Sequence, residues 1–261
     1  MSRVAVVTGA ARGIGAATVD ALVAQGLCVV AVDRCRDDPA IGYPLGTKAQ
    51  LDSVVHGHGD RALGLVADVR SSSDMQLAVD TAVEHFGRLD VAVACAGVIA
   101  GGGPLWEMSD AAYDAVIDIN LNGTRRLFSA ATPSLLESGA PRHGRLIAVS
   151  SAAGLIGLRH LAAYSAAKHG VVGLTKSLAC DLAGTGVTAN VICPGSTDTS
   201  ILGASADLYG LDSTADFIEH QLLGRLLSPK EPASLIAWIA SEASSGVTGA
   251  ALSVDGGMTA T

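Results

Sequence analysis

Short runs of apolar, often β-branched residues alternate along the chain with longer segments whose apolar positions recur at helical spacing. The runs are VAVVTG, LCVVAVD, ALGLVADV, LDVAVACAG, GRLIAVSS and VTANVICPG, and the first helical segment covers Ile14 to Gln25. Strands that are apolar at consecutive positions are typical of a parallel sheet covered on both faces. The pattern predicts an α/β fold: a single doubly wound (Rossmann) domain over residues 1–261, with helices on both faces of a parallel sheet.

Two segments interrupt this alternation, and each follows a predicted strand. Gly154 to Leu158 and Ser196 to Leu223 have irregular sequence without a clear helical or strand period. In an open parallel sheet, ligands bind beyond the carboxyl ends of the strands. We therefore expect both segments to form walls of a substrate site, with residues 197–223 as a lid.

The first strand runs into the glycine-rich stretch TGAARGIGAATVDAL, where Gly9, Gly13 and Gly15 precede a helix. Glycine permits a tight turn and close backbone approach, and a helix N-terminus presents N–H groups to a pyrophosphate. The spacing G-x-x-x-G-x-G therefore predicts a dinucleotide phosphate site. The alternative is a tight strand-to-helix turn without a ligand.

The second strand ends at Asp33, 18 residues after Gly15. A carboxylate there can accept hydrogen bonds from the adenosine ribose diol, and it repels the 2′-phosphate of NADP. Arg12 and Arg34 lie close in sequence to these groups and can pair with a 2′-phosphate. The balance favours NAD over NADP, and a solvated strand end remains the alternative for Asp33.

The stretch AAYSAAKHG places Tyr164 four residues before Lys168 in a chain with only four Tyr and three Phe. Residues i and i+4 share one face of a helix, and an adjacent cation stabilises a phenolate and lowers the pKa of tyrosine. Ser151 ends the run GRLIAVSS at the predicted cofactor edge of the sheet. Ser150 is the alternative, although successive strand residues point to opposite faces.

Taken together, these motifs resemble the short-chain dehydrogenase/reductase family over nearly the whole chain. The matching features, in order, are TGAARGIG, Asp33, ADV, IDINLNG, VSS, YSAAK, ICPGSTDT and VDGG. The resemblance implies that Tyr164 is the acid/base, while Lys168 lowers its pKa and binds the nicotinamide ribose. It also implies that Ser151 steadies the substrate oxygen and that Asn120 holds a water in a proton relay.

The same resemblance implies further contacts to NAD. Asp68 and Val69 would flank the adenine, Ile14 would lie at the nicotinamide end, and Pro194, Gly195 and Thr199 would frame the carboxamide. The complete predicted set is Gly9, Arg12, Gly13, Ile14, Gly15, Asp33, Asp68, Val69, Gly97, Tyr164, Lys168, Pro194, Gly195, Thr197 and Thr199.

One position departs from the family pattern. Residues 94–97 read Ala-Cys-Ala-Gly where the family commonly has Asn-Asn-Ala-Gly. A side-chain amide that ties neighbouring strands is therefore absent, so we expect the cleft to be held in a different way.

An insertion around residues 36–57 lengthens the connection from Asp33 to Asp68 to 35 residues. Loops of this length inside a compact domain are usually functional or disordered, and the apolar residues here favour an ordered one. Thr47 and Gln50 fit a capping box that begins the next helix. With DVAVACAGVIAGGGPLW and GVTANVICPGSTDTSIL, the insertion resembles the mycofactocin-coupled subgroup of the family. That resemblance implies a tightly held NAD and mycofactocin as electron acceptor; a surface insertion without a cofactor role is the alternative.

Composition limits the possible partners. Seventeen basic and 25 acidic residues give a formal net charge of −8, which argues against nucleic acid or an anionic membrane as partner. Five cysteines without a C-x-x-C motif are interpreted as reduced core residues of a cytoplasmic protein, and the start of the chain lacks the order of a secretory signal. His143, His160 and His169 lack metal-ligand partners at useful spacing, so no metal site is expected.

The sequence therefore predicts an NAD(P)-dependent short-chain dehydrogenase/reductase acting on CH–OH groups, which uses NAD to interconvert an apolar secondary alcohol and a ketone. The apolar character rests on two sets of candidate wall residues. The lid set is Ile201, Leu202, Leu208, Tyr209, Leu211, Phe217, Ile218, Leu222 and Leu223, and the opposite set is Val98, Ile99, Trp106, Ile156 and Leu158. The alternatives are a 3-oxoacyl-thioester (acyl carrier protein) reductase and a non-catalytic dinucleotide-binding sensor.

A homotetramer is also expected. The helical segments Ala111 to Glu137 and Leu161 to Leu182, with the terminal VTGAALSVDGG, resemble the pairing surfaces of family tetramers. Closed symmetric assembly is a common way of covering exposed helix faces.

Overall fold

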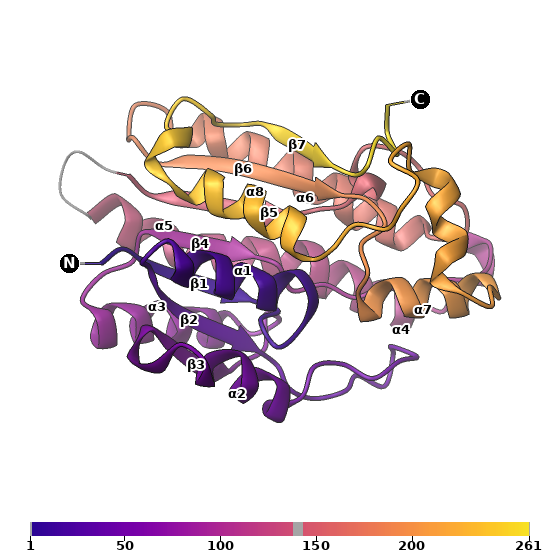
Figure 1. Ribbon diagram of the computed structural model, residues 1–261, viewed down its shortest axis with the longest axis horizontal. Helices are drawn as coiled ribbons and strands as arrows, with labels where there is room; N and C mark the ends of the chain where they lie inside the picture. Colours follow the sequence, from indigo (N-terminus) through magenta and orange to yellow (C-terminus); the bar gives the residue numbers. More distant parts are fainter. Residues whose placement is uncertain (1, 138–142, 261) are drawn as a thin grey trace.

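A computed structural model describes residues 2–137 and 143–260, so Met1 and Thr261, the two ends of the predicted domain, lie outside the described residues. Seven parallel strands form one sheet in the order β3-β2-β1-β4-β5-β6-β7 (Figure 1). The strands are β1 (Val4–Thr8), β2 (Cys28–Asp33), β3 (Ala62–Val66), β4 (Val91–Ala94), β5 (Arg145–Val149), β6 (Thr188–Pro194) and β7 (Ala251–Val254). The predicted doubly wound Rossmann domain is confirmed.

Helices cover both faces of this sheet, and each face has its own hydrophobic cluster. One cluster holds α1 (Gly13–Ala24), α2 (Lys48–His56) and α8 (Lys230–Ala240). The other holds α3 (Ser72–Phe86), α4 (Asp110–Ile117), α5 (Gly123–Glu137) and α6 (Ala162–Asp181), together with part of α7 (Ser200–Tyr209).

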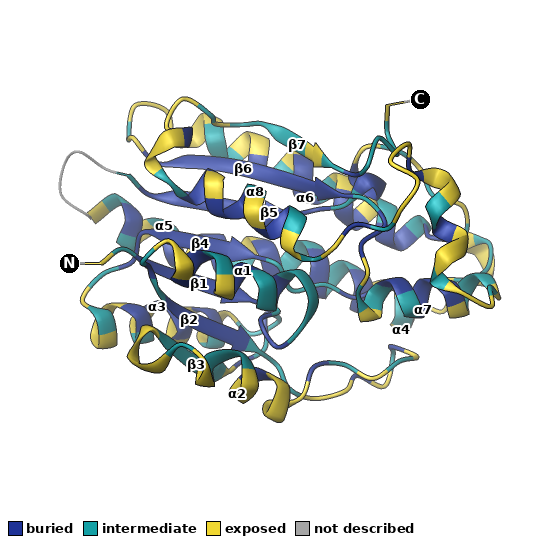
Figure 2. Cartoon of the chain, in the orientation of Figure 1, coloured by how far each residue is buried: buried dark blue, intermediate teal, exposed yellow. Residues whose placement is uncertain are grey.

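The strands show why their sequences are apolar without alternation. All five residues of β1 are buried, with Val6 in one hydrophobic cluster and its neighbour Val7 in the other. Figure 2 shows the central strands buried along most of their length. Successive side chains of a strand point to opposite faces of the sheet, and both faces are covered by helices. Side chains on either face are therefore buried.

Two predicted segments differ in the structure. The helical segment Ala111 to Glu137 is divided by a π-helical turn over Asp118–Asn122. The segment Ser196 to Leu223, expected to be irregular, contains α7 and a 3₁₀ helix over Thr214–His220. These helices are stabilised by tertiary packing, since Leu202, Ala206 and Phe217 form a small buried cluster of their own.

The cysteines differ partly from the expectation that they lie in the core. All five are free thiols, but only Cys193 is buried. Cys28, Cys35 and Cys95 are partly exposed, and Cys180 is exposed on the last turn of α6. An apolar sequence neighbourhood does not by itself bury a residue that lies at the start of a strand, in a loop after a strand or on the last turn of a helix.

The insertion is ordered and contains a helix. The predicted capping box is present: Thr47 Oγ1 accepts from Gln50 N at 3.2 Å, and Gln50 Oε1 accepts from Thr47 N at 2.9 Å. Leu51 is fully buried where α2 packs on the sheet. Residues 34–47, here called the strap, leave β2 and extend toward α4 and α7 before returning to α2 (Figure 1).

Candidate active site

A cleft of about 870 Å³ lies at the carboxyl ends of the strands. All fifteen residues predicted to bind the cofactor line it, as does Ser151. They come from the segments that follow β1, β2, β3, β4, β5 and β6, and from α6. Asn120, the remaining predicted catalytic residue, does not line the cleft.

The glycine turn between β1 and α1 requires its glycines. Gly9 and Gly13 have positive φ angles of 69° and 59°. A Cβ on Gly15 would lie 2.0 Å from the carbonyl oxygen of Gly9, so only glycine fits there. Arg12 caps α1 without a side-chain hydrogen bond, so the first N–H groups of the helix remain for an anionic ligand. The turn fits a pyrophosphate.

Asp33 is oriented by the turn on one side and the strap on the other. Its Oδ2 accepts from Ala11 N and its Oδ1 from Cys35 N, both at 3.1 Å. Gly46 returns against it, because a Cβ on Gly46 would lie 3.0 Å from Asp33 Oδ1. A fixed carboxylate that lines the cleft one strand from the glycine turn fits the diol of an adenosine ribose.

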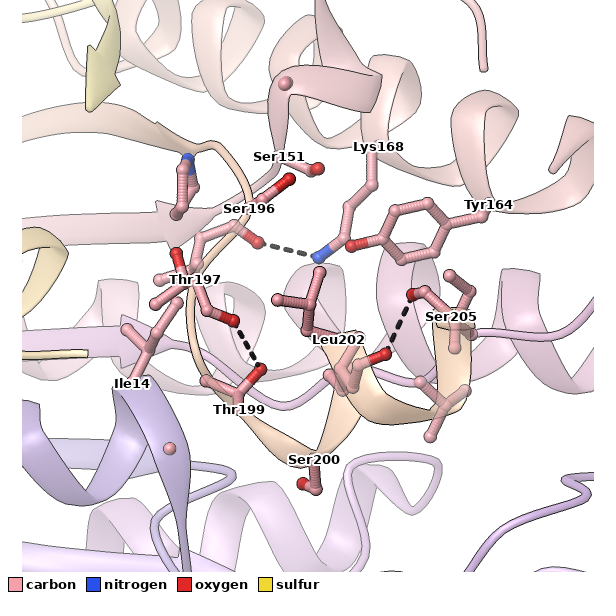
Figure 3. A pocket seen from close by; sticks show the side chains of 18 of the residues that line it. Ile14, Ser151, Tyr164, Lys168, Ser196, Thr197, Thr199, Ser200, Leu202 and Ser205 are labelled. Carbon is pink, nitrogen blue, oxygen red and sulfur yellow. Dashed lines mark hydrogen bonds between the residues drawn. The ribbon is translucent and has the colours of Figure 1, made fainter. Parts of the chain in front are cut away.

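Helix α6 supplies the tyrosine and lysine. Both side chains are buried, and Lys168 Nζ lies 5.5 Å from the centroid of the Tyr164 ring. Nζ also donates to Val149 O at 2.9 Å, which anchors the lysine to the end of β5. Figure 3 shows the Tyr164 hydroxyl and Lys168 Nζ directed into the same part of the pocket, with Ser151 beside them.

Ser151, and not Ser150, offers its hydroxyl to the cleft. Ser150 Oγ is buried and donates to Lys168 O at 2.9 Å. Ser151 Oγ accepts from Ala153 N at 3.2 Å and keeps its proton for another partner. Ser150 and Ser151 follow directly after β5, and their hydroxyls have different partners, as expected for successive residues of an extended chain.

Burial controls the ionisation of the tyrosine and lysine. It raises the pKa of Tyr164 to about 12, opposed by a hydrogen bond with Ser151. It lowers the pKa of Lys168 to about 8. The pKa of Tyr164 is thus shifted opposite to the direction expected from a neighbouring ammonium, because desolvation disfavours both charged forms.

Asn120 positions the loop after β4. Its Oδ1 accepts from Val98 N at 3.2 Å, and its Nδ2 donates to Val98 O at 2.9 Å and Val116 O at 2.8 Å. The side chain is buried within the π-helical turn. A Cβ on Gly97 would lie 2.7 Å from Asn120 Oδ1 and 3.5 Å from Lys168 Nζ. Asn120 therefore acts on the cleft through the loop that forms its wall.

Thr8 ties β1 to β4 near the departure from the family pattern. Its Oγ1 accepts from Cys95 N at 3.2 Å and Ala96 N at 3.3 Å. Thr8 was not predicted as a site residue, since a buried threonine at the end of a strand has no distinctive sequence pattern. Residues 94 and 95 are Ala and Cys, so they lack the side-chain amide that is common in the family. Thr8 supplies hydrogen bonds between the two strands at this point.

The substrate walls are only partly as predicted. Cleft-lining residues from the two predicted sets are Ile201, Leu202, Tyr209, Leu211, Phe217, Leu222, Val98, Ile99, Ile156 and Leu158. Leu208, Ile218 and Leu223 do not line it. The prediction that Trp106 forms part of the wall was also wrong. Trp106 lies on a short 3₁₀ helix after glycines 101–103 and is 84% exposed.

The strap is attached to both sides of the cleft. Arg12 Nη2 donates to Pro44 O at 2.8 Å, and Ile99 N donates to the Tyr43 hydroxyl at 3.0 Å. Leu45 and Gly46, which follow these attachment points in the strap, line the cleft. Tyr43 was not predicted as a site residue, because its partner Ile99 is distant in sequence.

A glycine turn, an oriented carboxylate and a buried tyrosine–lysine–serine group around one cleft define a dinucleotide-dependent oxidoreductase on a Rossmann fold. The chain belongs to the short-chain dehydrogenase/reductase family: the family model described as enoyl-(acyl carrier protein) reductase matches residues 9–259.

Several relatives match over nearly their whole length. The cis-4-hydroxycyclohexanecarboxylate dehydrogenase of Sinomonas cyclohexanicum is 40% identical, covering 99% of this chain and 97% of the relative. The (-)-trans-carveol dehydrogenase of Rhodococcus erythropolis is 36% identical, covering 98% and 97%. A crystal structure of carveol dehydrogenase from Mycobacterium avium in complex with NAD has a TM-score of 0.93 at 29% identity, covering 99% and 98%.

Residues 2–137 and 143–260 contain neither a candidate membrane-spanning helix nor a candidate metal site. No helix within residues 2–137 and 143–260 has the length and apolar character to cross a bilayer. Across the same residues, no group of three or more His, Cys, Asp or Glu side chains is arranged to hold a metal ion.

Proposed function

We propose that the protein is an NAD-dependent oxidoreductase that interconverts an apolar secondary alcohol and a ketone. The observation that carries the proposal is the convergence of Tyr164, Lys168 and Ser151 on the cleft that contains the glycine turn and Asp33. NAD supplies the hydride acceptor when it is bound. Similar proteins have been solved with NAD, and others are named as a cis-4-hydroxycyclohexanecarboxylate dehydrogenase and a (-)-trans-carveol dehydrogenase.

The side chains of the cleft divide the remaining work. Tyr164 exchanges a proton with the substrate oxygen, and the Ser151 hydroxyl donates a hydrogen bond to that oxygen. Lys168 holds the nicotinamide ribose and stabilises the phenolate once Tyr164 has lost its proton. The raised pKa of Tyr164 keeps it protonated at neutral pH, which suits proton donation during ketone reduction.

The remaining cofactor contacts are proposed from their positions around the cleft. Gly9, Gly13 and Gly15 would cradle the pyrophosphate, and Asp33 would bind the adenosine ribose. The other predicted contacts would hold the adenine and the nicotinamide: Arg12, Ile14, Asp68, Val69, Gly97, Pro194, Gly195, Thr197 and Thr199.

The substrate is proposed to be apolar because α7 and the loop after β5 bring aliphatic and aromatic side chains to the cleft. A 3-oxoacyl-thioester reductase usually favours NADPH, and the position of Asp33 opposes a 2′-phosphate. A non-catalytic sensor would not need the buried Tyr164, Lys168 and Ser151. Turnover with a panel of secondary alcohols distinguishes the three: sustained inactivity with every alcohol would contradict the proposal.

We further propose that NAD does not exchange freely and that mycofactocin reoxidises it. The support is the strap, which is hydrogen-bonded to the cleft residues Arg12 and Ile99 and contributes Leu45 and Gly46 to the lining. Affinity differences appear mostly in dissociation rates, so a covered adenosine end favours retention. We also propose that the protein is cytoplasmic and forms a homotetramer. Residues 197–223 are proposed to act as the substrate lid.

Mass spectrometry of molecules released from denatured purified protein tests retention directly. We expect NAD to survive dialysis, and added substrate to give one turnover per site unless an artificial electron acceptor is present. Shortening the segment from Asp37 to Gly46 should restore exchange. Sustained turnover of the intact enzyme on free NAD alone would refute the coupled mechanism while leaving the dehydrogenase proposal intact.

A further inference from the structure

Four charged side chains form a closed ring at the edge of the cleft where Asp33 lies. Arg34 and Arg70 alternate in this ring with Asp38 and Asp68. Asp38 belongs to the strap, whereas Asp68 and Arg70 follow β3. Arg34 and Asp68 also line the cleft, so the ring borders the proposed adenosine end.

The position of Arg34 makes its partners important for cofactor choice. It directly follows Asp33, and an arginine beside the adenosine ribose can bind the 2′-phosphate of NADP through a paired hydrogen bond. An arginine that is held by carboxylates in ion pairs must leave those pairs before it can bind a phosphate. Whether Arg34 is paired with carboxylates or free therefore influences whether the cleft binds NADP.

Two carboxylates hold Arg34 in place. Its Nη1 donates to Asp38 Oδ2 at 2.7 Å, whereas its Nε lies 3.1 Å from Asp68 Oδ2 as an ion pair without a hydrogen bond. Arg70 contacts the same two carboxylates, with Nη1 2.8 Å from Asp38 Oδ2 and Nη2 2.8 Å from Asp68 Oδ2. Two guanidinium groups and two carboxylates give the ring a formal charge of zero.

Asp38 is rigidly placed within the strap. Its side chain is only 5% exposed, and its Oδ1 accepts from Ala40 N at 2.9 Å. Ile41 N donates back to Asp38 O at 3.0 Å, and the Ile41 side chain is buried in the core. Although burial acts to raise the pKa of Asp38, hydrogen bonds from Ala40 and Arg34 outweigh it, so the pKa is lowered. Asp38 is thus a fixed, ionised partner for Arg34.

The strap also engages the second arginine that the sequence left open. Arg12 Nη2 donates to Pro44 O at 2.8 Å. Both arginines that offered a positive charge to a 2′-phosphate are therefore held by strap residues, and Asp33 contributes a repulsive charge at the same place. The strap removes attraction, while Asp33 adds repulsion.

We propose that Asp38 is a specificity-determining residue, which excludes NADP by holding Arg34 away from the 2′ position of the adenosine ribose. This inference rests on the proposed use of NAD, but on neither the substrate nor the electron acceptor. It assigns the strap a role in cofactor choice that is separate from cofactor retention. The proposal predicts that Asp33 and Asp38 act together in excluding NADP. Even when Asp33 no longer repels the 2′-phosphate, that phosphate still needs an Arg34 that Asp38 does not hold.

The test measures which nucleotide the folding chain binds. The protein is synthesised in a cell-free system containing equal concentrations of NAD and NADP, isolated by gel filtration and denatured, and the released nucleotides are quantified by mass spectrometry. This design works whether or not the bound nucleotide later exchanges. The variants are Asp33→Asn, Asp38→Asn, both together, and both with Arg34→Ala.

We expect the wild type to contain almost only NAD. The ratio of NADP to NAD should be roughly tenfold or more higher in the double variant than in Asp33→Asn, the size of one charge-assisted hydrogen bond. Adding Arg34→Ala should cancel that gain. Asp37→Asn is the matched control, because Asp37 is the exposed neighbouring carboxylate and its contact is to Leu45 N. It should leave the ratio unchanged.

Equal ratios in the double variant and in Asp33→Asn would overturn the role of Asp38. If the Asp38 variants do not fold, Arg34→Ala in the Asp33→Asn background decides the question. An unchanged ratio there supports the proposal, whereas a tenfold fall would show that Arg34 already reaches the phosphate. Wild-type protein that binds neither nucleotide would refute the proposed function along with this inference.

Discussion

Burial favours the neutral forms of Tyr164 and Lys168. For Lys168, this has a measurable effect on the free energy of unfolding. Burial lowers the pKa of Lys168 from its ordinary 10.5 to about 8. Between these values the unfolded chain binds more protons than the folded one, so the free energy of unfolding rises with pH. Below pH 8 the full cost of burying the ammonium is present.

Replacing Lys168 with Met removes this cost. We expect nucleotide-free Lys168→Met protein to be stabilised at pH 7 by up to about 3 kcal/mol, reduced by loss of the bond to Val149 O. The advantage should shrink as pH rises from 8 toward 10. Urea unfolding across this interval measures it, and a difference that does not vary with pH would contradict the prediction.

The phenol oxygen of Tyr164 is expected to transfer the substrate proton. Tyr164→Phe keeps the buried ring and deletes only that oxygen, so turnover should fall on the order of a hundredfold or more. Nucleotide content measured by mass spectrometry should stay at the wild-type level, because the glycine turn and Asp33 are untouched. Activity close to that of the wild type would remove Tyr164 from the mechanism.

At the scale of elements, Asn120 lies in the π-helical turn, and its side chain forms hydrogen bonds with the backbone of Val98 and Val116. Asn120→Ala would leave Val98 N, Val98 O and Val116 O without their side-chain partner, which should lower the free energy of unfolding by about 2 kcal/mol or more. Asn122→Ala, in the same turn, removes a bond to Asp118 and should cost clearly less. Denaturant unfolding of both variants compares them, and equal losses would argue against a special role for Asn120.

The strap makes a second prediction at this scale. Tyr43→Phe deletes the hydroxyl that accepts from Ile99 N and should speed the release of bound NAD several-fold, one hydrogen bond being worth about 1 kcal/mol. Loss of NAD during timed dialysis, followed by mass spectrometry, measures the rate. Tyr113→Phe makes the same chemical change on α4, where the side chain is 38% exposed, and should release NAD as the wild type does.

Features with a local physical cause were predictable from the sequence. The strands were visible because both faces of the sheet are buried, and the start of α2 was visible because Thr47 and Gln50 satisfy the N-terminal N–H groups within four residues. The glycine turn and the Tyr164–Lys168 spacing are local in the same way. Each pattern contains its own partners, so a short stretch of sequence is enough to recognise it.

Features that depend on distant partners were not predictable. Thr8 meets residues 95–96, Tyr43 meets Ile99, and Asn120 meets Val98, each through a contact that only the folded chain creates. Trp106 was wrongly placed because its apolar ring suits a pocket wall, whereas its position on a short 3₁₀ helix leaves it 84% exposed. Helix α7 was missed because it depends on packing with Phe217.

At the scale of the whole molecule, β7 leaves one edge of the sheet open beside α8. Trp238 on α8 is 42% exposed, and an open strand edge is commonly covered in native proteins. We expect light scattering to give four times the chain mass, and Trp238→Glu to reduce that mass. Leu77→Glu, on the comparably exposed α3 surface, should not change it. A wild-type monomer at micromolar concentration would contradict the expected tetramer.

The strap leaves β2 and is hydrogen-bonded to Arg12 after β1 and to Ile99 after β4, both of which line the cleft. Under the proposed retention, a dinucleotide enters while the chain is still folding, and a finished molecule exchanges it only slowly. Each molecule would then be loaded once, when it is made. A cell that synthesised the enzyme during a shortage of NAD would carry an inert fraction until that fraction was degraded, so catalytic capacity would reflect past NAD supply more than the present concentration.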